Sequence, residues 1–147
     1  MTVRYIVNVE AAIVHDERYL MIVRGAAEAH APGTLSLPGG KVENAGVTAS
    51  ILEETLRREI REEAAVEIED ELVYIKSKSF IADDSDQVID IVFLCRYRSG
   101  EPAPMEPEEV AALSWMTADD VLRHPKTPLW THQSIELAER RRLELGW

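Results

Sequence analysis

The chain has 147 residues, 46% of them hydrophobic, and a formal net charge of −11 at pH 7. That length fits one domain, residues 1–147, with a single core, and the hydrophobic share is too high for a disordered chain. The acidic charge repels nucleic-acid backbones, and no cluster of lysine and arginine offsets it, so we expect no nucleic-acid polymer as a partner. An anionic small molecule would need a divalent cation between itself and the protein.

Neither membrane insertion nor export is indicated by the sequence. It has no run of about eighteen apolar residues, the length that a membrane-spanning helix needs. The N-terminal MTVRYIVNVE carries charges inside its apolar stretch and lacks a cleavage pattern, which argues against a signal peptide. The single cysteine, Cys95, cannot form an internal disulfide and lies in an apolar run, so we expect it in the core. A reducing cytoplasm is the expected location.

The first half of the chain predicts two strands, a long loop and a helix. The β-rich runs at 4–16 and 18–25 indicate a hairpin or neighbouring strands around the turn-like sequence HDE. Residues 26–46 are rich in Gly and Pro and are expected to form a loop. Residues 48–64 have helical spacing, with Ser50 and Glu53 as a plausible capping box and Thr48 as the rival N-cap.

The second half predicts more strands and two helices. Two strands at 66–81 and 87–99 flank a polar loop, and a Pro-rich acidic loop follows at 99–109. A short strand at 110–116 leads to a short helix with Thr117 as N-cap, and residues 131–145 form a closing helix. Strands on both sides of a central helix place the chain in the mixed α and β class.

Three glutamates crowd one side of the central helix. Glu59, Glu62 and Glu63 stand at i, i+3 and i+4, so they share a side. At about 100° per residue, Glu63 projects between Leu52 and Leu56, inside the apolar stripe that should be buried. An ionised carboxylate at the edge of a core is unfavourable unless it is paired or binds a metal.

Two interpretations of this acidic side follow. A solvated face on a surface helix is the ordinary one, and it suits Glu62 better than Glu63. The other is a metal site, because three hard oxygen ligands from one helix suit Mg²⁺ or Mn²⁺. Arg58 offsets one charge, since it stands four residues before Glu62, although the arginine-first order is the weaker orientation.

The sequence GGKVE at 39–43, followed after a gap by REIREEAAV at 58–66, resembles the motif of the Nudix (MutT-type) hydrolase family. That motif is Gly, five residues, Glu, seven residues, then Arg-Glu-apolar-any-Glu-Glu-any-Gly-apolar. Residues 24–43 and 100–122 are also similar to flanking segments of MutT-type members, so the resemblance covers most of the chain. It implies an α+β fold, a mixed β-sheet with flanking helices in an α/β/α sandwich.

Two departures from the motif matter. Arg58 comes four residues later after Gly40 than the motif places it, so Gly46 stands at the position of the first motif glutamate. Because four residues are close to one helical turn of about 3.6, an insertion of this size can lengthen the front of the helix while the later glutamates keep their direction. Ala65 replaces the glycine that ends the motif helix, and we expect a strained or differently shaped exit.

The resemblance implies roles for the matching residues. Glu59, Glu62 and Glu63 would bind Mg²⁺ or Mn²⁺, with the Gly40 carbonyl as a further ligand. Arg58 would orient the glutamates through a salt bridge. An ordinary surface ion pair that contributes little is the alternative for Arg58.

The implied reaction is attack of water on a phosphorus of a diphosphate linkage, which joins a nucleoside to a second group. Metal would lower the pKa of the water, neutralise the diphosphate and hold the leaving oxygen. The general base stays open between Glu59 or Glu63 on the helix and a glutamate of the acidic loop. In that loop Glu109 matches the commoner family position and Glu106 the MutT position, while Glu108 is also available.

The substrate is expected to be a small nucleotide, most plausibly a (deoxy)nucleoside triphosphate, because the chain is short and lacks an added recognition domain. Oxidised nucleotides, ADP-ribose and dinucleoside polyphosphates stay open, as does the oligomeric state, including a homodimer. The first alternative function is a Nudix-like regulatory module that binds a nucleotide without turnover. The second is an acidic helical protein-interaction domain without metal affinity.

Four further side chains carry weaker expectations. Lys41 and Arg24 are candidates for contacting phosphate and equally for solvent exposure. Trp130 is a candidate for stacking on a base, although a tryptophan near a helix start more often lies in the core. His30 is expected to be polar surface.

Overall fold

The computed structural model describes residues 1–43 and 46–147. Within these residues the strands are β1 (Ile6–His15), β2 (Arg18–Arg24), β3 (Leu35–Ser36), β4 (Gly39–Lys41), β5 (Glu67–Ile81), β6 (Gln87–Ser99) and β7 (Val110–Thr117). The helices are α1 (Ile51–Ala64), α2 (Ala118–Arg123) and α3 (Leu129–Leu145). No helix in this part of the chain is long and apolar enough to cross a membrane.

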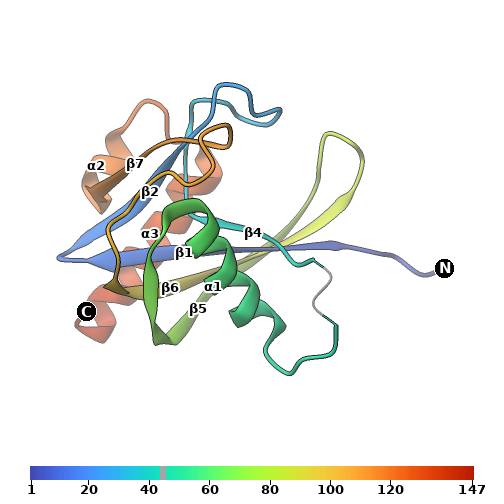
Figure 1. Ribbon diagram of the computed structural model, residues 1–147, viewed down its shortest axis with the longest axis horizontal. Coiled ribbons are helices and arrows are strands. Elements are labelled where there is room, and N and C mark those ends of the chain that lie inside the picture. Colours follow the sequence, from blue (N-terminus) through green and yellow to red (C-terminus); the bar gives the residue numbers. More distant parts are fainter. Residues whose placement is uncertain (44–45) are drawn as a thin grey trace.

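The strands belong to one mixed sheet with β1 at its centre (Figure 1). The strand order is β3-β2-β1-β6-β5, while β4 pairs with β1 and β7 pairs with β2. The pairing of β1 with β6 is parallel and the other pairings are antiparallel. The first half of β1 lies between β4 and β6, so it has neighbours on both edges.

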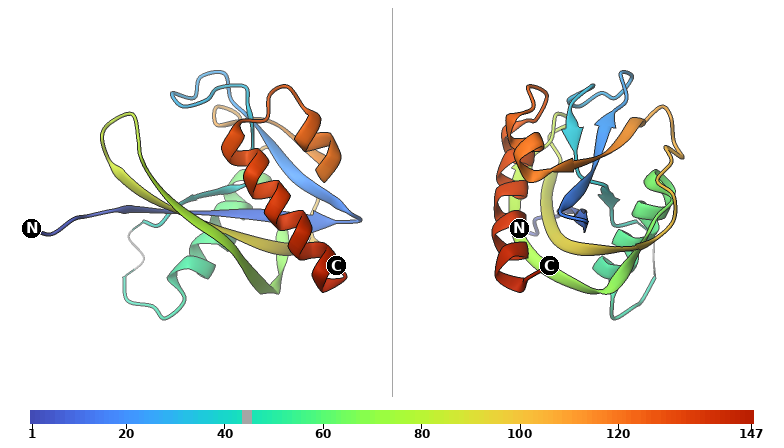
Figure 2. Two further views of the ribbon diagram at one scale, coloured as in Figure 1. Left: turned by 180° about the vertical axis from the view of Figure 1, so that it is seen from behind. Right: turned by 90° about the vertical axis from the view of Figure 1, so that its left-hand side faces the viewer.

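Helices cover both faces of this sheet, with α1 on one side and α2 and α3 on the other (Figure 2). Val9, Ala11 and Ile13 of β1 pack in the core under α1. Ala12 and Val14 pack in the core shared with α2 and α3. Successive residues of a strand point to opposite faces, so β1 supplies both cores. The predicted α/β/α arrangement of a mixed sheet is confirmed.

The first two strands form the predicted hairpin. His15 pairs with Arg18, so the turn consists of Asp16 and Glu17 alone. Both have positive φ, 48° and 64°. Two positive φ values are typical of the type I′ turn, whose twist matches that of the flanking strands.

The second half of the chain follows the predicted elements closely. β5, β6 and β7 lie where the sequence places them. Thr117 is the N-cap of α2, and its hydroxyl accepts a hydrogen bond from the Asp120 N–H at 3.1 Å. α3 begins at Leu129, two residues before the predicted start, with Pro128 at the N-cap. Helix ends are the least certain part of any such prediction.

The predicted loop at 26–46 is wrong in part, because it contains the short strands β3 and β4. β4 pairs with β1 through the partners Asn8 with Lys41, Val9 with Gly40 and Glu10 with Gly39. A Cβ on Gly39 would lie 2.1 Å from the Val9 carbonyl oxygen. This close approach of two backbones is why glycine occupies the position, and glycine carries no side-chain pattern that predicts a strand.

The predicted front of the central helix is also corrected. α1 begins at Ile51 with Ser50 at the N-cap, but the Ser50 side chain makes no capping bond, so the capping box with Glu53 is wrong. Thr48 instead accepts a hydrogen bond from the Ser50 N–H at 3.3 Å and donates one to Glu54 at 3.0 Å. The helix therefore begins inside the stretch that contains the extra motif residues: residues 46–50 precede it, while Ile51 and Leu52 belong to it. Residues 44 and 45 of that stretch lie outside the described residues.

The end of α1 keeps the left-handed conformation that glycine favours. Ala65 is the C-cap, with φ 60° and ψ 29°, and its N–H donates to the Arg61 carbonyl at 3.1 Å. Of the two expected outcomes, the strained exit is confirmed and the differently shaped exit is wrong. The conformation itself is unfavourable for alanine, by about 1–2 kcal/mol relative to the right-handed region.

Replacing Ala65 with glycine should therefore stabilise the protein. Glycine adopts this φ without steric conflict but loses more conformational entropy on folding, so we expect a net gain of about 0.5–1 kcal/mol. Urea unfolding of A65G should show a higher midpoint with an unchanged slope. The control is A64G, one residue earlier at a buried helical position, which should lower the midpoint. A midpoint lowered equally in both variants would contradict this reading of the helix end.

Candidate active site

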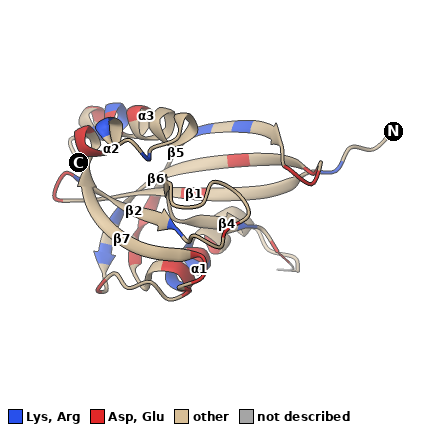
Figure 3. Cartoon of the chain, turned by 90° about the horizontal axis from the view of Figure 1, so that it is seen from above, with Lys and Arg blue, Asp and Glu red and all other residues tan. Residues whose placement is uncertain are grey.

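The predicted site residues gather where α1 crosses β4 and the loop before β7 passes the end of α1. Acidic segments of α1 lie beside β4 in Figure 3. Leu56 and Ile60 are buried in the core beneath the helix, which fixes the direction of the glutamates between and after them. The apolar face predicted for this helix is confirmed.

Glu63 is a half-buried carboxylate held by the backbone of β4. Its Oε1 accepts a hydrogen bond from the Gly39 N–H at 2.8 Å. No ion pair with Glu63 occurs among the described residues. Burial raises the pKa of Glu63 to about 8, although the Gly39 hydrogen bond acts in the opposite direction. The neighbouring carboxyls of Glu59 and Glu109 raise this pKa further.

Glu59 lies directly against Gly40. A Cβ placed on Gly40 would be 2.2 Å from the Cδ atom of Glu59, so any side chain at residue 40 would displace this carboxyl group. The Glu59 side chain is only 14% exposed. Burial raises its pKa to about 7, partly offset by Arg58, whose Nη1 lies 3.1 Å from Glu59 Oε1.

Arg58 joins three groups around the site. Besides Glu59, its guanidinium contacts Glu62 Oε2 at 3.4 Å and donates to the Lys41 carbonyl of β4 at 3.3 Å. The Glu62 side chain is 45% exposed, so this carboxylate stands at the solvent edge of the group. The bond to β4 ties the arginine to the strand as well as to its own helix, which an isolated surface ion pair would not do.

The register of β4 decides which glycine carbonyl faces the helix. The Ala11 N–H donates to the Pro38 carbonyl and the Val42 N–H donates to the Val7 carbonyl, each at 2.8 Å. Hydrogen-bonded pairs alternate along an antiparallel ladder, so the Gly40 carbonyl is directed at the β1 backbone. Gly39 belongs to a pair that is not hydrogen-bonded to β1, and its N–H donates to Glu63 instead. Its carbonyl therefore projects away from β1.

The acidic loop is tied to the last turn of α1. The Ala103 N–H donates to the Ala64 carbonyl at 3.0 Å, and the Met105 N–H donates to the Glu63 carbonyl at 3.3 Å. A turn follows in which the Glu106 carbonyl accepts from the Glu109 N–H at 2.9 Å. The loop thus places Glu106 and Glu109 near the carboxyl groups of α1.

Two loop glutamates act on the helix site. The negative charge of Glu106 raises the pKa of both Glu59 and Glu63. The neighbouring Glu106 carboxyl raises the pKa of Glu109. Glu106 is half-buried, whereas Glu108 and Glu109 are exposed.

The carboxylates of this site suit a hard divalent cation, although their side chains do not converge on one point. Nowhere in residues 1–43 and 46–147 do three acidic, histidine or cysteine side chains converge closely enough to hold an ion. Arg58 holds Glu62 outward, and Gly39 holds Glu63 against the strand. Even so, Glu59 and Glu63 are half-buried, and of the two only Glu59 has an ion pair among the described residues, so a divalent cation would supply the missing positive charge.

The weaker candidates lie elsewhere. Arg24 is engaged by Glu28 at 2.7 Å and by the His30 carbonyl at 2.9 Å, so it is not a free phosphate ligand. Lys41 is exposed at the end of β4, and His30 is exposed as expected. Trp130 is 39% exposed and does not lie in the core.

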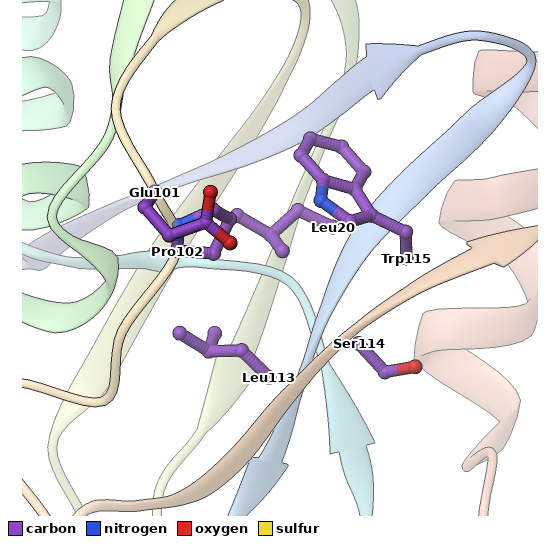
Figure 4. A pocket seen from close by; sticks show the side chains of 6 residues that line it. All are labelled: Leu20, Glu101, Pro102, Leu113, Ser114 and Trp115. Carbon is purple, nitrogen blue, oxygen red and sulfur yellow. The ribbon is translucent and has the colours of Figure 1, made fainter.

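A pocket of about 310 Å³ opens between β2, β7 and the start of the acidic loop (Figure 4). It is lined by Leu20, Glu101, Pro102, Leu113, Ser114 and Trp115. None of the predicted site residues lines it. The carboxylates of α1 therefore form a surface site that this pocket does not contain.

Comparison with known proteins is consistent with this geometry. The family model for the NUDIX domain matches residues 5–137. A MutT NUDIX hydrolase from Burkholderia pseudomallei superposes with a TM-score of 0.76 at 32% identity, over 91% of this chain and 98% of that one. A MutT protein from Methanosarcina mazei Go1 superposes with a TM-score of 0.75 at 23% identity, over 97% and 98%. Among curated proteins, a sequence search finds no match.

Removing the Glu63 charge should stabilise the metal-free protein at high pH. An unfolded chain releases the proton of this carboxyl near its ordinary pKa of 4.5, while the folded protein retains it until about pH 8. The group therefore lowers stability progressively as pH rises from about 4.5 to 8, and by a constant amount above that. E63Q keeps the acceptor for Gly39 and loses the charge.

The measurement is thermal unfolding of both proteins in a chelating buffer between pH 5 and pH 8.5. E63Q should melt at nearly the temperature of the unsubstituted protein at pH 5 and several degrees higher at pH 8.5, since about 3 °C corresponds to roughly 1 kcal/mol in a domain of this size. A difference that is the same at every pH would contradict the burial of an ionisable Glu63.

Proposed function

This chain belongs to the NUDIX family, and from that premise we propose that it is a Mg²⁺- or Mn²⁺-dependent hydrolase of a nucleoside diphosphate linked to a second group. Family members are hydrolases that act on pyrophosphate bonds and generally use divalent metal ions. We propose a (deoxy)nucleoside triphosphate as the substrate. The half-buried pair Glu59 and Glu63, whose pKa values are raised by burial to about 7 and about 8, is the observation that supports this proposal, because a bound cation would stabilise their ionised forms.

Glu59, Glu62 and Glu63 are the proposed ligands of the metal. The register of β4 favours the Gly39 carbonyl as the backbone ligand over the Gly40 carbonyl that the motif suggested. When bound, the divalent cation lowers the pKa of a water, neutralises the diphosphate and holds the leaving oxygen. The net charge of −11 makes such a cation necessary for an anionic substrate to approach.

The remaining groups position these ligands. The Gly39 N–H fixes one oxygen of Glu63, which leaves the other free. Gly40 leaves the space that the Glu59 carboxyl occupies. Arg58 holds Glu59 and Glu62 on the same side of α1 and anchors them to β4. We therefore assign Arg58 a positioning role.

Glu106 is the proposed general base that removes the proton of the attacking water. It lies in the acidic loop that is bonded to the last turn of α1, and it is half-buried there, unlike Glu108 and Glu109. Its charge acts on both Glu59 and Glu63, which indicates that it faces them. Glu109, the other loop candidate, is exposed, while Glu59 and Glu63 are the proposed metal ligands.

A nucleotide-binding module without turnover is the second candidate. Two departures from the motif favoured it, and neither disturbs the site. Ala65 adopts the left-handed conformation of the glycine that it replaces. The extra residues leave Glu63 bonded to Gly39 and Glu59 against Gly40.

A nucleotide panel tests hydrolysis directly. With Mg²⁺, the protein should release phosphate or pyrophosphate from at least one nucleoside triphosphate. E63Q should lower kcat/KM by about 100-fold or more, because even residues that only support a metal ligand contribute roughly 10–100-fold. E53Q, a change in the first turn of the same helix, is the matched control and should leave turnover unaltered. Binding of nucleotides without turnover of any would favour the regulatory module.

Substitutions in the acidic loop test the general base. E106Q should reduce kcat by about 10²–10⁴-fold with little change in KM, as expected for loss of a base. E109Q should reduce kcat by a smaller factor. E108Q, the control in the same loop, should leave kcat unchanged. If E109Q proves the most damaging of the three, the assignment passes from Glu106 to Glu109.

A further inference from the structure

The acidic loop is bonded to the rest of the protein at both ends, although it packs loosely in between. None of residues 100–109, all of which the structure describes, is buried. The pocket of Figure 4 lies beneath the start of the loop, between Glu101 and Pro102 on one side and Leu20 of the core on the other. The position of Glu106 in this loop therefore depends on a small number of hydrogen bonds.

Tyr97, near the end of β6, holds the start of the loop. Its hydroxyl donates a hydrogen bond to the Gly100 carbonyl. Its ring packs against those of His15 and Trp115, with centroid distances of 4.7 Å and 5.5 Å. Because β1 and β7 supply these two rings, the Tyr97 hydroxyl is held by the sheet, and the chain is tied to it as it leaves β6.

Gly100 allows the chain to turn towards α1. Its φ is 100°, which favours glycine, and a Cβ there would lie 2.6 Å from the carbonyl oxygen of the C-cap residue of α1. The N–H groups of Ala103 and Met105 then donate to the carbonyls of Ala64 and Glu63. The last carbonyls of a helix have no partner within the helix, so the loop satisfies two of them. The loop is thereby bonded to the backbone of a proposed metal ligand.

Gly25, directly after β2, holds the end of the loop. Its N–H donates a hydrogen bond to the Glu109 carbonyl at 2.8 Å. A Cβ on Gly25 would lie 2.1 Å from the Glu108 carbonyl oxygen, so this close approach of two backbones requires glycine. The Glu106 carbonyl accepts hydrogen bonds from the Glu109 and Val110 N–H groups, at 2.9 Å and 2.8 Å. Gly25 therefore fixes the turn that begins at Glu106.

We propose that Tyr97 and Gly25 are positioning residues of the hydrolysis, because they hold Glu106 near the carboxyl groups of α1. The proposal rests on the proposed function and adds to it two residues that act only through Glu106. The charge of Glu106 raises the pKa of both Glu59 and Glu63, so it lies within electrostatic reach of them. A displaced loop would move Glu106 relative to the attacking water, and a displacement of about 1 Å can lower a rate by about 100-fold.

Amide hydrogen exchange tests the attachment of the loop without substrate or metal. Y97F removes the hydroxyl and keeps the aromatic ring. It should raise the exchange rates of the Ala103 and Met105 amides by about threefold or more, because these bonds to α1 open more often once the start of the loop is released. The amide of Ala82, which is hydrogen-bonded in the loop between β5 and β6, is the internal control and should exchange at its original rate.

Kinetic constants test whether the attachment matters for turnover. Y97F should lower kcat by about 3–10-fold and G25A by about 10–100-fold, with KM nearly unchanged in both. Their Mn²⁺ affinity, measured by calorimetry, should equal that of the unsubstituted protein, because β4 and not the loop holds the glutamates of α1. Y97F is the milder change and decides the test if G25A does not fold. Y74F, which removes the hydroxyl bonded to Ser77 on β5, is the matched control and should retain full kcat.

A double-mutant cycle tests whether Tyr97 acts through Glu106. Once residue 106 cannot accept a proton, the position of the loop should no longer affect the rate, so Y97F/E106Q should turn over as fast as E106Q. Additive losses, a loss that appears in KM or Mn²⁺ affinity instead of kcat, or unchanged amide exchange in Y97F would overturn the inference. Absence of turnover in the unsubstituted protein would overturn the proposed hydrolysis, whereas faster exchange in Y97F would still establish that Tyr97 holds the loop.

Discussion

The close packing of α1 on the two-glycine strand β4 is the contact on which the site depends. Because Gly39 and Gly40 have no side chains, the helix brings the carboxyls of Glu59 and Glu63 against the backbone of β4. Both groups become half-buried there, and burial raises the pKa of each. Glu59 raises the pKa of Glu63 further, and a bound divalent cation would relieve this unfavourable arrangement.

The central strand β1 connects this contact to the rest of the molecule. Through β4 it sets the position of the glycines, and through its alternating side chains it anchors the core beneath α1 and the core beneath α3. The same alternation directs Glu10 to the α3 side, while its partner Gly39 contacts Glu63 of α1 through its backbone N–H. The pair of β1 and β4 therefore links the proposed phosphate chemistry to both cores of the molecule.

Much of this was predictable from sequence, because it is encoded in local periodicity. The apolar spacing of Leu56 and Ile60 determines where the helix glutamates point, and the β-rich runs predict the long strands. β4 was missed because its two glycines have no side chains that could show a strand pattern. The predicted Ser50 capping box is absent, and Thr48 bonds to Glu54 instead. The approach of distant elements, such as Asn8 to Asp90, depends on strand register, which a single sequence does not contain.

Direct measurement of metal affinity tests the central claim that Glu59 and Glu63 form a cation site. Calorimetric titration with Mn²⁺ at pH 7.5, without nucleotide, should show a binding event in the unsubstituted protein. The double variant E59Q/E63Q should lose at least about tenfold in that affinity. Equal Mn²⁺ affinity in the two proteins, or no heat of binding in either, would contradict the account.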